Sequence, residues 1–294
     1  MKLTSIYRRL RRILDPALPK ATVNEFKTKF WQSDAGASVF TEGSDANHRP
    51  YAAIMDAVIN EFFLEQCPPA SKILDLGCGH GIVSVFLAQH GHSIVACDVS
   101  KPLLSALSEN KNGLDIEIRE GDAHHIPAAE DEFDVIVARM FLPHFPDWPS
   151  ILREMARCCR PGGRLLIHFT SKENAAIARR MGEHDCEFAT SPVLNWRQVN
   201  PFTFFAEADQ LEIDKVCRKL GLRVLKRAPN TFFLHNRLIG HSLGTSRYQI
   251  YQEEIERFFQ KGEVREFVIW FEKNAVQHLP VWMTYYNVLV VEKL

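Results

Sequence analysis

Residues 73–83 read ILDLGCGHGIV and place three glycines at alternate positions directly after an apolar run. In an α/β sheet, a strand that turns through glycines into a helix lies at the carboxyl edge, where ligands bind. Glycine suits such a turn because it has no side chain, so a ligand can approach the main chain closely. Asp75 lies two residues before the first glycine, and the ligand must therefore tolerate a nearby carboxylate.

The chain after Lys72 alternates between strand-like and helix-like patterns. Continuous apolar strands separated by helices predict a parallel sheet with helices on both faces, which is the α/β fold class. The predicted strands cover residues 72–77, 92–98, 115–122, 133–139, 164–169, 222–228 and 285–293. The predicted helices cover residues 50–66, 82–90, 101–110, 147–159 and 207–220, with two more between residues 237 and 283.

The overall composition argues against several function classes. The 294 residues carry a net charge of −1, so no basic excess favours nucleic acid as a partner. No apolar run reaches the roughly 18 residues that span a bilayer, and the N-terminus lacks the pattern of a signal peptide. The seven cysteines form no C-x-x-C pair, which favours reduced thiols and offers no zinc-like spacing. We therefore expect a cytoplasmic protein without a metal site.

Residues 2–15, KLTSIYRRLRRILD, have the pattern of a basic amphipathic helix. Apolar residues recur on one face at helical spacing, and four arginines crowd the rest. Such a helix can lie on an anionic membrane surface, and it can equally pack on its own domain with a solvated basic face. The sequence leaves both interpretations open, so peripheral membrane contact is one of two alternatives here.

Two ligands compete for the glycine turn: a dinucleotide and S-adenosylmethionine. The dinucleotide fingerprint G-x-G-x-x-G matches Gly77 and Gly79, but its third position is Ile82, and the third glycine is Gly81. A carboxylate at Asp75 would repel a pyrophosphate, whereas it suits a ligand that carries an ammonium and a sulfonium group. Glycine spacing and charge together favour S-adenosylmethionine.

Two further carboxylates end the next two predicted strands. Asp98 follows the second strand, where it can accept hydrogen bonds from both ribose hydroxyls, although a helix-capping role is the alternative. Asp122 follows the third strand, where it can accept from the adenine amino group, although a turn aspartate is common at such a position. The glycine turn strengthens the ligand-binding interpretation of Asp98.

Five stretches together resemble the class I S-adenosylmethionine-dependent methyltransferases, and most of all the branch that includes the quinone-biosynthesis enzymes. They are ILDLGCGHG, ACDVS, EGDAHHIP, FDVIVARMFLPHFPD and EMARCCRPGGRLLI, and the resemblance is close over residues 70–169. It implies a Rossmann-like seven-stranded sheet whose last strand is antiparallel, with the cofactor across the carboxyl ends of the first strands. The cofactor residues that the resemblance implies are Asp75, Gly77, Cys78 and Gly79 at the methionine end, Asp98 and Val99 at the ribose and adenine, Asp122 and Ala123 at the adenine, and Arg139 beside the cofactor.

His144 is the candidate general base on the acceptor side. It lies just past the fourth predicted strand, near the expected position of the methyl group. Many relatives carry two histidines in this stretch, and here Pro143 replaces the first. A base is needed only if the acceptor must lose a proton, and a structural histidine is the alternative interpretation.

Segments outside the core pattern are rich in aromatic residues, which is typical of an apolar or ring-bearing small-molecule ligand. We divide the chain into an N-terminal helical cap, residues 1–70, and a methyltransferase domain, residues 71–294, with helical lid insertions at about 170–206 and 237–283. The predicted function is methyl transfer to oxygen or carbon of a ring-bearing or lipid-linked acceptor. A non-catalytic protein that binds the cofactor, and less favourably a dinucleotide-dependent oxidoreductase, are the alternatives.

Overall fold

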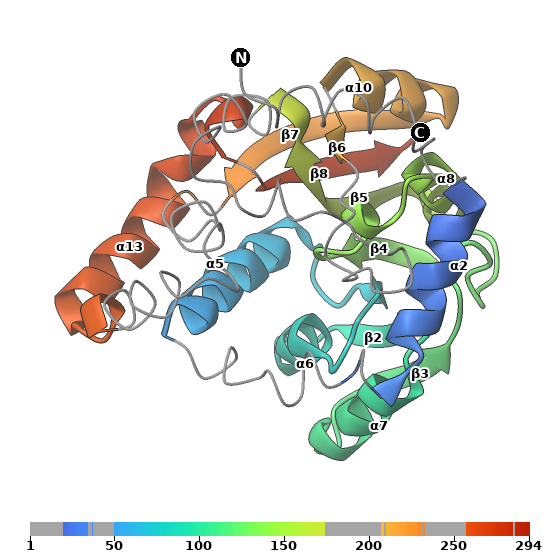
Figure 1. The fold of residues 1–294 in the computed structure, drawn as a ribbon, viewed down its shortest axis with the longest axis horizontal. Coiled ribbons are helices and arrows are strands. Elements are labelled where there is room, and N and C mark those ends of the chain that lie inside the picture. Colours follow the sequence, from blue (N-terminus) through green and yellow to red (C-terminus); the bar gives the residue numbers. More distant parts are fainter. Residues whose placement is uncertain are drawn as a thin grey trace, which may run out of the picture.

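A single sheet organises the computed structural model, which describes residues 20–34, 37, 50–173, 207–208, 210–230, 232, 257–284 and 286–294. The strands follow the order β3-β2-β1-β4-β5-β8-β7, and short β6 pairs with β5 off this path (Figure 1). They are β1 Lys72–Leu76, β2 Ser93–Asp98, β3 Ile116–Glu120, β4 Phe133–Ala138, β5 Cys159–Ser171, β6 Glu207–Ala208, β7 Leu222–Asn230 and β8 Tyr286–Lys293.

The strand directions confirm the predicted fold class. Strands β1 to β5 are mutually parallel where they pair. The last strand, β8, runs antiparallel to both β5 and β7, as the family resemblance implies. The seven strands of the main path therefore form the expected Rossmann-like, mostly parallel sheet.

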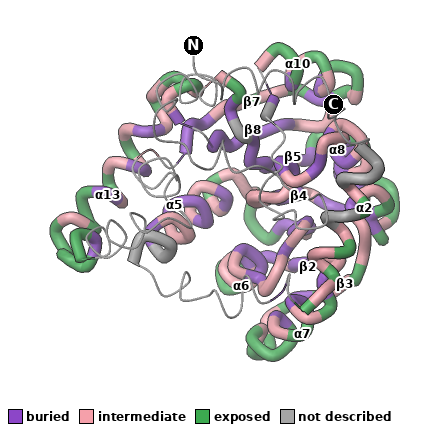
Figure 2. The backbone as a smooth tube through the Cα atoms, viewed as in Figure 1, coloured by how far each residue is buried: buried purple, intermediate pink, exposed green. Residues whose placement is uncertain are grey.

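Helices cover both faces of this sheet (Figure 1). Helices α5, α6 and α7 pack on one face through Phe63, Leu87 and Leu107, and α8 and α10 pack on the other through Ile151 and Ile213. Figure 2 shows the central strands as mostly buried, with exposed turns on the outer helices. The helices are α2 Lys20–Trp31, α5 Pro50–Gln66, α6 Ile82–Gln89, α7 Lys101–Asn110, α8 Trp148–Cys158, α10 Gln210–Lys219 and α13 Gly262–Asn274, with 3-10 turns η1 Leu142–His144, η5 Val276–His278 and η6 Val281–Met283.

Two predicted boundaries differ from the structure by more than two residues. Strand β5 begins at Cys159, five residues before the predicted start at residue 164, because Cys159 pairs with Phe133 before a register shift. The predicted helix 207–220 begins only at Gln210, because residues 207–208 pair with the far end of β5 as β6. Both differences come from pairing between distant segments, which local periodicity does not encode.

Several predicted segments lie largely or wholly outside the described residues. These are the basic helix at residues 2–15, the first insertion beyond residue 173, and residues 237–256 of the second insertion, so the domain division stays a prediction. Helix α13, from the second insertion, packs on α5 through Val268 and Ile54. Among the described residues, no helix is both long enough and apolar enough to cross a membrane.

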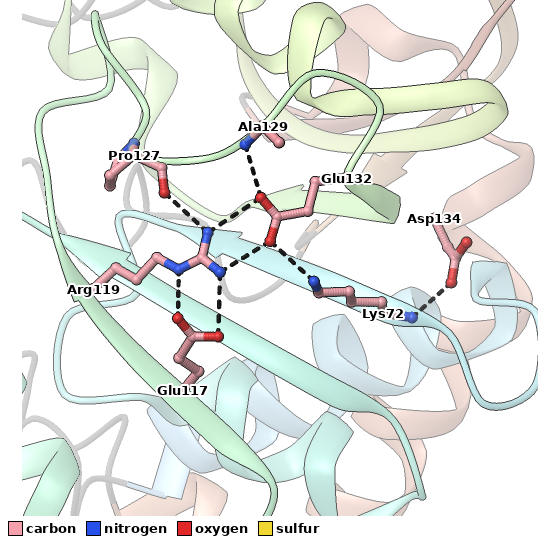
Figure 3. Close-up of polar contacts among 7 residues, drawn as sticks. All are labelled: Lys72, Glu117, Arg119, Pro127, Ala129, Glu132 and Asp134. Atoms are coloured by element: carbon pink, nitrogen blue, oxygen red, sulfur yellow. Dashed lines mark hydrogen bonds and ion pairs between the residues drawn. The ribbon is translucent and has the colours of Figure 1, made fainter.

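An ion-pair network ties together three strands at the amino edge of β1 and β4 (Figure 3). The Glu132 carboxylate accepts hydrogen bonds from Arg119 at 2.9 Å, from Lys72 at 2.9 Å and from the Ala129 amide at 2.8 Å. These bonds, with that of Arg119 foremost, lower the pKa of Glu132 to about 2. The Arg119 side chain also pairs with Glu117. The network thus joins the amino end of β1 and the start of β4 to the carboxyl half of β3, and we expect it to stabilise the sheet.

The network predicts a stability loss that depends on pH. Glu132→Gln should lower the free energy of unfolding by about 1–3 kcal/mol near neutral pH, because charge-assisted bonds are lost. A folded-state pKa near 2 means that this contribution is complete above about pH 4.5 and disappears as the pH falls toward 2. Urea unfolding at several pH values measures it. Glu130→Gln, at an exposed neighbour, is the control, and equal stability of both variants near neutral pH would contradict the assignment.

Candidate functional site

The three glycines of the turn after β1 adopt left-handed backbone for different reasons. Their φ angles are 72°, 54° and 91° at Gly77, Gly79 and Gly81. A Cβ atom at Gly77 would lie 2.1 Å from the Phe141 ring, and one at Gly81 would lie 2.3 Å from Leu107. At Gly79 the nearest atom to such a Cβ is 4.0 Å away. Gly77 and Gly81 therefore serve packing, whereas Gly79 leaves its main chain bare.

Asp98 connects the end of β2 to this turn. Its carboxylate accepts the Gly79 amide at 2.9 Å and the Ser100 amide at 2.9 Å. Burial raises the pKa of Asp98, and these amide bonds oppose the rise. A carboxylate has lone pairs beyond these two bonds, so Asp98 can also accept from a ligand hydroxyl.

Ser100 is a polar residue at this edge whose ligand-facing potential the sequence analysis missed. It occupies the N-cap position of α7, but its hydroxyl makes no capping bond. The hydroxyl is fully buried and has no hydrogen-bond partner among the described residues. A buried hydroxyl without a partner is costly, and this one lies two residues from Asp98.

The structure places Asp75 beneath the turn. Its side chain is 2% exposed and accepts a hydrogen bond from the Ser84 hydroxyl of α6 at 2.6 Å. Burial is the main cause that raises the pKa of Asp75 to about 6. Side chains alternate along a strand, so Asp75 faces α6 while the ligand edge lies beyond it. The next cofactor candidate, Cys78, is also buried, and burial raises the pKa of its thiol.

Helix α2 closes over the residues that follow β3. His124 donates from Nδ1 toward Asp122 at 2.8 Å, and its Nε2 lies 3.1 Å from Asp147. Asn24 of α2 donates to the other oxygen of Asp147 at 2.7 Å. Ala123 is buried between these residues. Asp122 itself is half-exposed, which leaves its second oxygen accessible.

The same helix reaches His144. The Trp31 ring packs edge-on against the His144 ring, with centroids 5.6 Å apart. His144 belongs to η1, directly after β4, and is partly buried. About seven residues of helix, or roughly 10 Å, separate Asn24 from Trp31, so α2 bridges the Asp122 region and His144. The sequence analysis did not identify Asn24 or Trp31, because contacts between distant segments leave no local pattern.

Arg139 follows β4 and pairs with Asp56 of α5. Its side chain is largely buried, and its charge helps to lower the pKa of the neighbouring His80, for which burial is the larger cause. On β5, His168 is fully buried, and burial together with Arg139 lowers its pKa to about 3. Neither ring nitrogen of His168 has a partner among the described residues. A neutral imidazole and a paired guanidinium therefore lie under α5.

Most sequence-predicted site residues gather at one edge of the sheet. Gly77, Cys78 and Gly79 follow β1, Asp98 and Val99 end β2, Asp122 and Ala123 follow β3, and Arg139 and His144 follow β4. These strands are parallel, so their carboxyl ends meet at the same edge. Asp75 is the exception, since its carboxylate points below this edge.

Known proteins resemble part of this chain. The methyltransferase domain family matches residues 74–167. A demethylmenaquinone methyltransferase of Mycobacterium marinum is 39% identical over 111 residues, 37% of this chain and 46% of that protein. The methyltransferase GfsG of Streptomyces halstedii is 40% identical over 101 residues, 33% of this chain and 36% of that protein. The chain thus spans less than half the length of these relatives.

Solved structures share the fold. A methyltransferase of Thermotoga maritima, described as a possible histamine N-methyltransferase, has a TM-score of 0.54 at 15% identity, over 87% of this chain and 98% of that one. Magnesium protoporphyrin IX methyltransferase of Synechocystis, solved with bound S-adenosylhomocysteine, has a TM-score of 0.52 at 13% identity, over 87% and 97%.

The residues at the edge fit S-adenosylmethionine, because Gly79, which has no side chain, adjoins the Asp98 carboxylate, and the Ser100 hydroxyl nearby has no hydrogen-bond partner among the described residues. The match to the methyltransferase domain family supports the same cofactor. Residues 74–167 thus match a methyltransferase domain, and this part of the chain is similar in sequence to demethylmenaquinone methyltransferases.

Proposed function

We propose that this chain transfers a methyl group from S-adenosylmethionine to oxygen or carbon of a small acceptor that is ring-bearing or lipid-linked. The observation that carries the proposal is the bond between the Asp98 carboxylate and the Gly79 amide. This bond places the glycine turn, which has no side chain at Gly79, next to a carboxylate that can accept ribose hydroxyls. A ligand made of a nucleoside joined to an amino acid needs both features. An oxidoreductase would need the third glycine of the dinucleotide fingerprint, which is absent.

Each end of the cofactor has candidate partners. Gly77, Cys78 and Gly79 would line the methionine end, with Asp75 contributing its charge from beneath. Asp98 and Val99 would meet the ribose, and the accessible oxygen of Asp122 would accept from the adenine amino group beside Ala123. Arg139 would lie next to the methionine end, where Asp56 balances its charge.

The bound cofactor supplies an electrophilic methyl carbon on its sulfonium. The chain then mainly has to orient the acceptor, and good alignment contributes up to about 7–11 kcal/mol in intramolecular reactions. His144 is the candidate base for an acceptor that must lose a proton. The Trp31 ring packs edge-on against the His144 ring from one side.

The acceptor class rests on two supports. Relatives 36–39% identical over their matched regions are named demethylmenaquinone methyltransferases, whose name indicates a ring-bearing, lipid-like acceptor. Aromatic residues are also frequent in the segments outside the core pattern. Both supports favour a hydroquinone-type ring as the first acceptor to test.

Cofactor binding provides the first test. S-adenosylhomocysteine should raise the melting temperature, since a ligand at 100 times its Kd stabilises the folded state by about 2.7 kcal/mol. Asp98→Asn should weaken its binding by about 1–3 kcal/mol in calorimetry, because the charged acceptor is lost. Asp115→Asn, at an exposed carboxylate, is the control. Stabilisation by NAD alone would show that the cofactor assignment is wrong.

Turnover provides the second test. With chemically reduced demethylmenaquinone as acceptor, the chain should convert S-adenosylmethionine to S-adenosylhomocysteine and a methylated ring. His144→Gln should lower kcat by about 100-fold or more if His144 removes the proton, while His278→Gln, at an exposed histidine, should match the wild type. Tight cofactor binding without turnover on hydroquinones, phenols or lipid-linked sugars would favour the non-catalytic alternative.

A further inference from the structure

We propose that His124 couples the docking of helix α2 to the orientation of Asp122, so that α2 is held more firmly over the adenine end of the site while the imidazole is protonated. His124 is thereby a positioning residue, acting through Asp122 and Asp147. The effect on cofactor binding rests on the proposed function. The docking of α2 is independent of the proposed function, because it depends only on contacts between residues of this protein.

A continuous series of hydrogen bonds links Asp122 to helix α2. One Asp122 oxygen accepts both the His124 backbone amide at 2.9 Å and its ring Nδ1 at 2.8 Å. The other ring nitrogen, Nε2, lies 3.1 Å from Asp147 Oδ2. Asp147 Oδ1 in turn accepts the Asn24 amide group of α2 at 2.7 Å. One Asp122 oxygen is thereby held by His124, and the second is left for a ligand.

The ring must be protonated to make both carboxylate bonds. A neutral imidazole has one N–H donor and one nitrogen lone pair, whereas the imidazolium donates from both nitrogens. In the neutral ring, one lone pair would face a carboxylate oxygen and repel it. Loss of the proton therefore removes one of the two ring donors, so that either Asp122 keeps only the backbone amide of His124 or Asp147 keeps only the Asn24 bond.

The surroundings of the ring favour the protonated form. The hydrogen bond to Asp122 is the largest cause that raises the pKa of His124, and Asp147 adds to it, while partial burial opposes them. His124 reciprocally lowers the pKa of Asp122, and His125 adds a smaller effect. Against this, the Asn24 Nδ2 donor of α2 lies 3.4 Å from Nε2, where it could donate only to an unprotonated nitrogen. The ring of Phe145, directly after η1, packs edge-on against the imidazole with centroids 5.6 Å apart.

The expected pH dependence follows from the upward direction of the pKa shift of His124. A raised folded-state pKa of His124 means that both carboxylate bonds of the ring are present below the ordinary histidine pKa. One of them is lost as the pH rises through the raised pKa. The described histidines His80, His92 and His168 have lowered pKa values and so are neutral above about pH 7. Asp75, with a pKa of about 6, is ionised there. These four groups therefore do not titrate between about pH 7 and pH 9.5.

Hydrogen exchange of the full chain without ligand tests the docking. The peptide covering residues 20–31 should lose protection by about tenfold or more between about pH 7 and pH 9.5, after correction for intrinsic rates. His124→Asn should show the low protection at both pH values, while His125→Asn, at the exposed neighbour, should behave as wild type. Circular dichroism and melting curves verify that the variants are folded. Equal, pH-independent protection in wild type and His124→Asn would overturn the proposal.

Calorimetry with S-adenosylhomocysteine tests the link to Asp122. Its affinity for the wild type should fall about tenfold or more over the same pH range, and the affinity of His124→Asn should be low and independent of pH. Unchanged affinity in His124→Asn would overturn the link between His124 and Asp122. Absence of any binding by the wild type would instead count against the proposed function, while the exchange experiment would still decide whether His124 docks α2.

Discussion

The hydrogen bond between the Asp98 carboxylate and the Gly79 amide holds the functional edge of this protein together. It joins the ends of β1 and β2, so the bare turn and the acidic strand end form one surface. The bond is possible because the two strands are parallel and paired in register through Asp75 and Leu76. A carboxylate that accepts main-chain amides keeps the turn in place while its remaining lone pairs stay available.

Packing on both sides of the turn supports that bond. Phe141 fills the space beside Gly77, and Leu107 fills the space beside Gly81, so a side chain at either glycine would collide with a ring or a leucine. The turn is thus enclosed by the segment after β4 and by α7. At the opposite edge, Glu132 ties β1, β3 and β4 by charge-assisted bonds. The bonds of Glu132 thus stabilise the sheet, while the glycine turn after β1 leaves main chain without a covering side chain at Gly79.

The site combines two kinds of carboxylate. Asp75 is buried against Ser84, and its charge acts from beneath the turn. Asp98 and Asp122 stand at strand ends, where a ligand can reach them, and Asp122 is also held by His124. The N-terminal helix α2 adds contacts at both the Asp122 end and the His144 end. The binding edge is therefore assembled from the parallel strands and covered by a segment that precedes them in the chain.

The sequence by itself determined where each strand lies and where it ends, since apolar runs encode the strands locally and the glycine turn marks the end of the first one. It also placed the residues from Gly77 to Arg139 at strand ends, and parallel strands bring those ends to one edge. Only the tertiary structure decided that Asp75 faces Ser84, that Asn24 and Trp31 reach the site, and that β6 pairs with β5. These depend on which face a strand turns to its neighbours and on contacts between distant segments, and neither leaves a period or motif in the sequence.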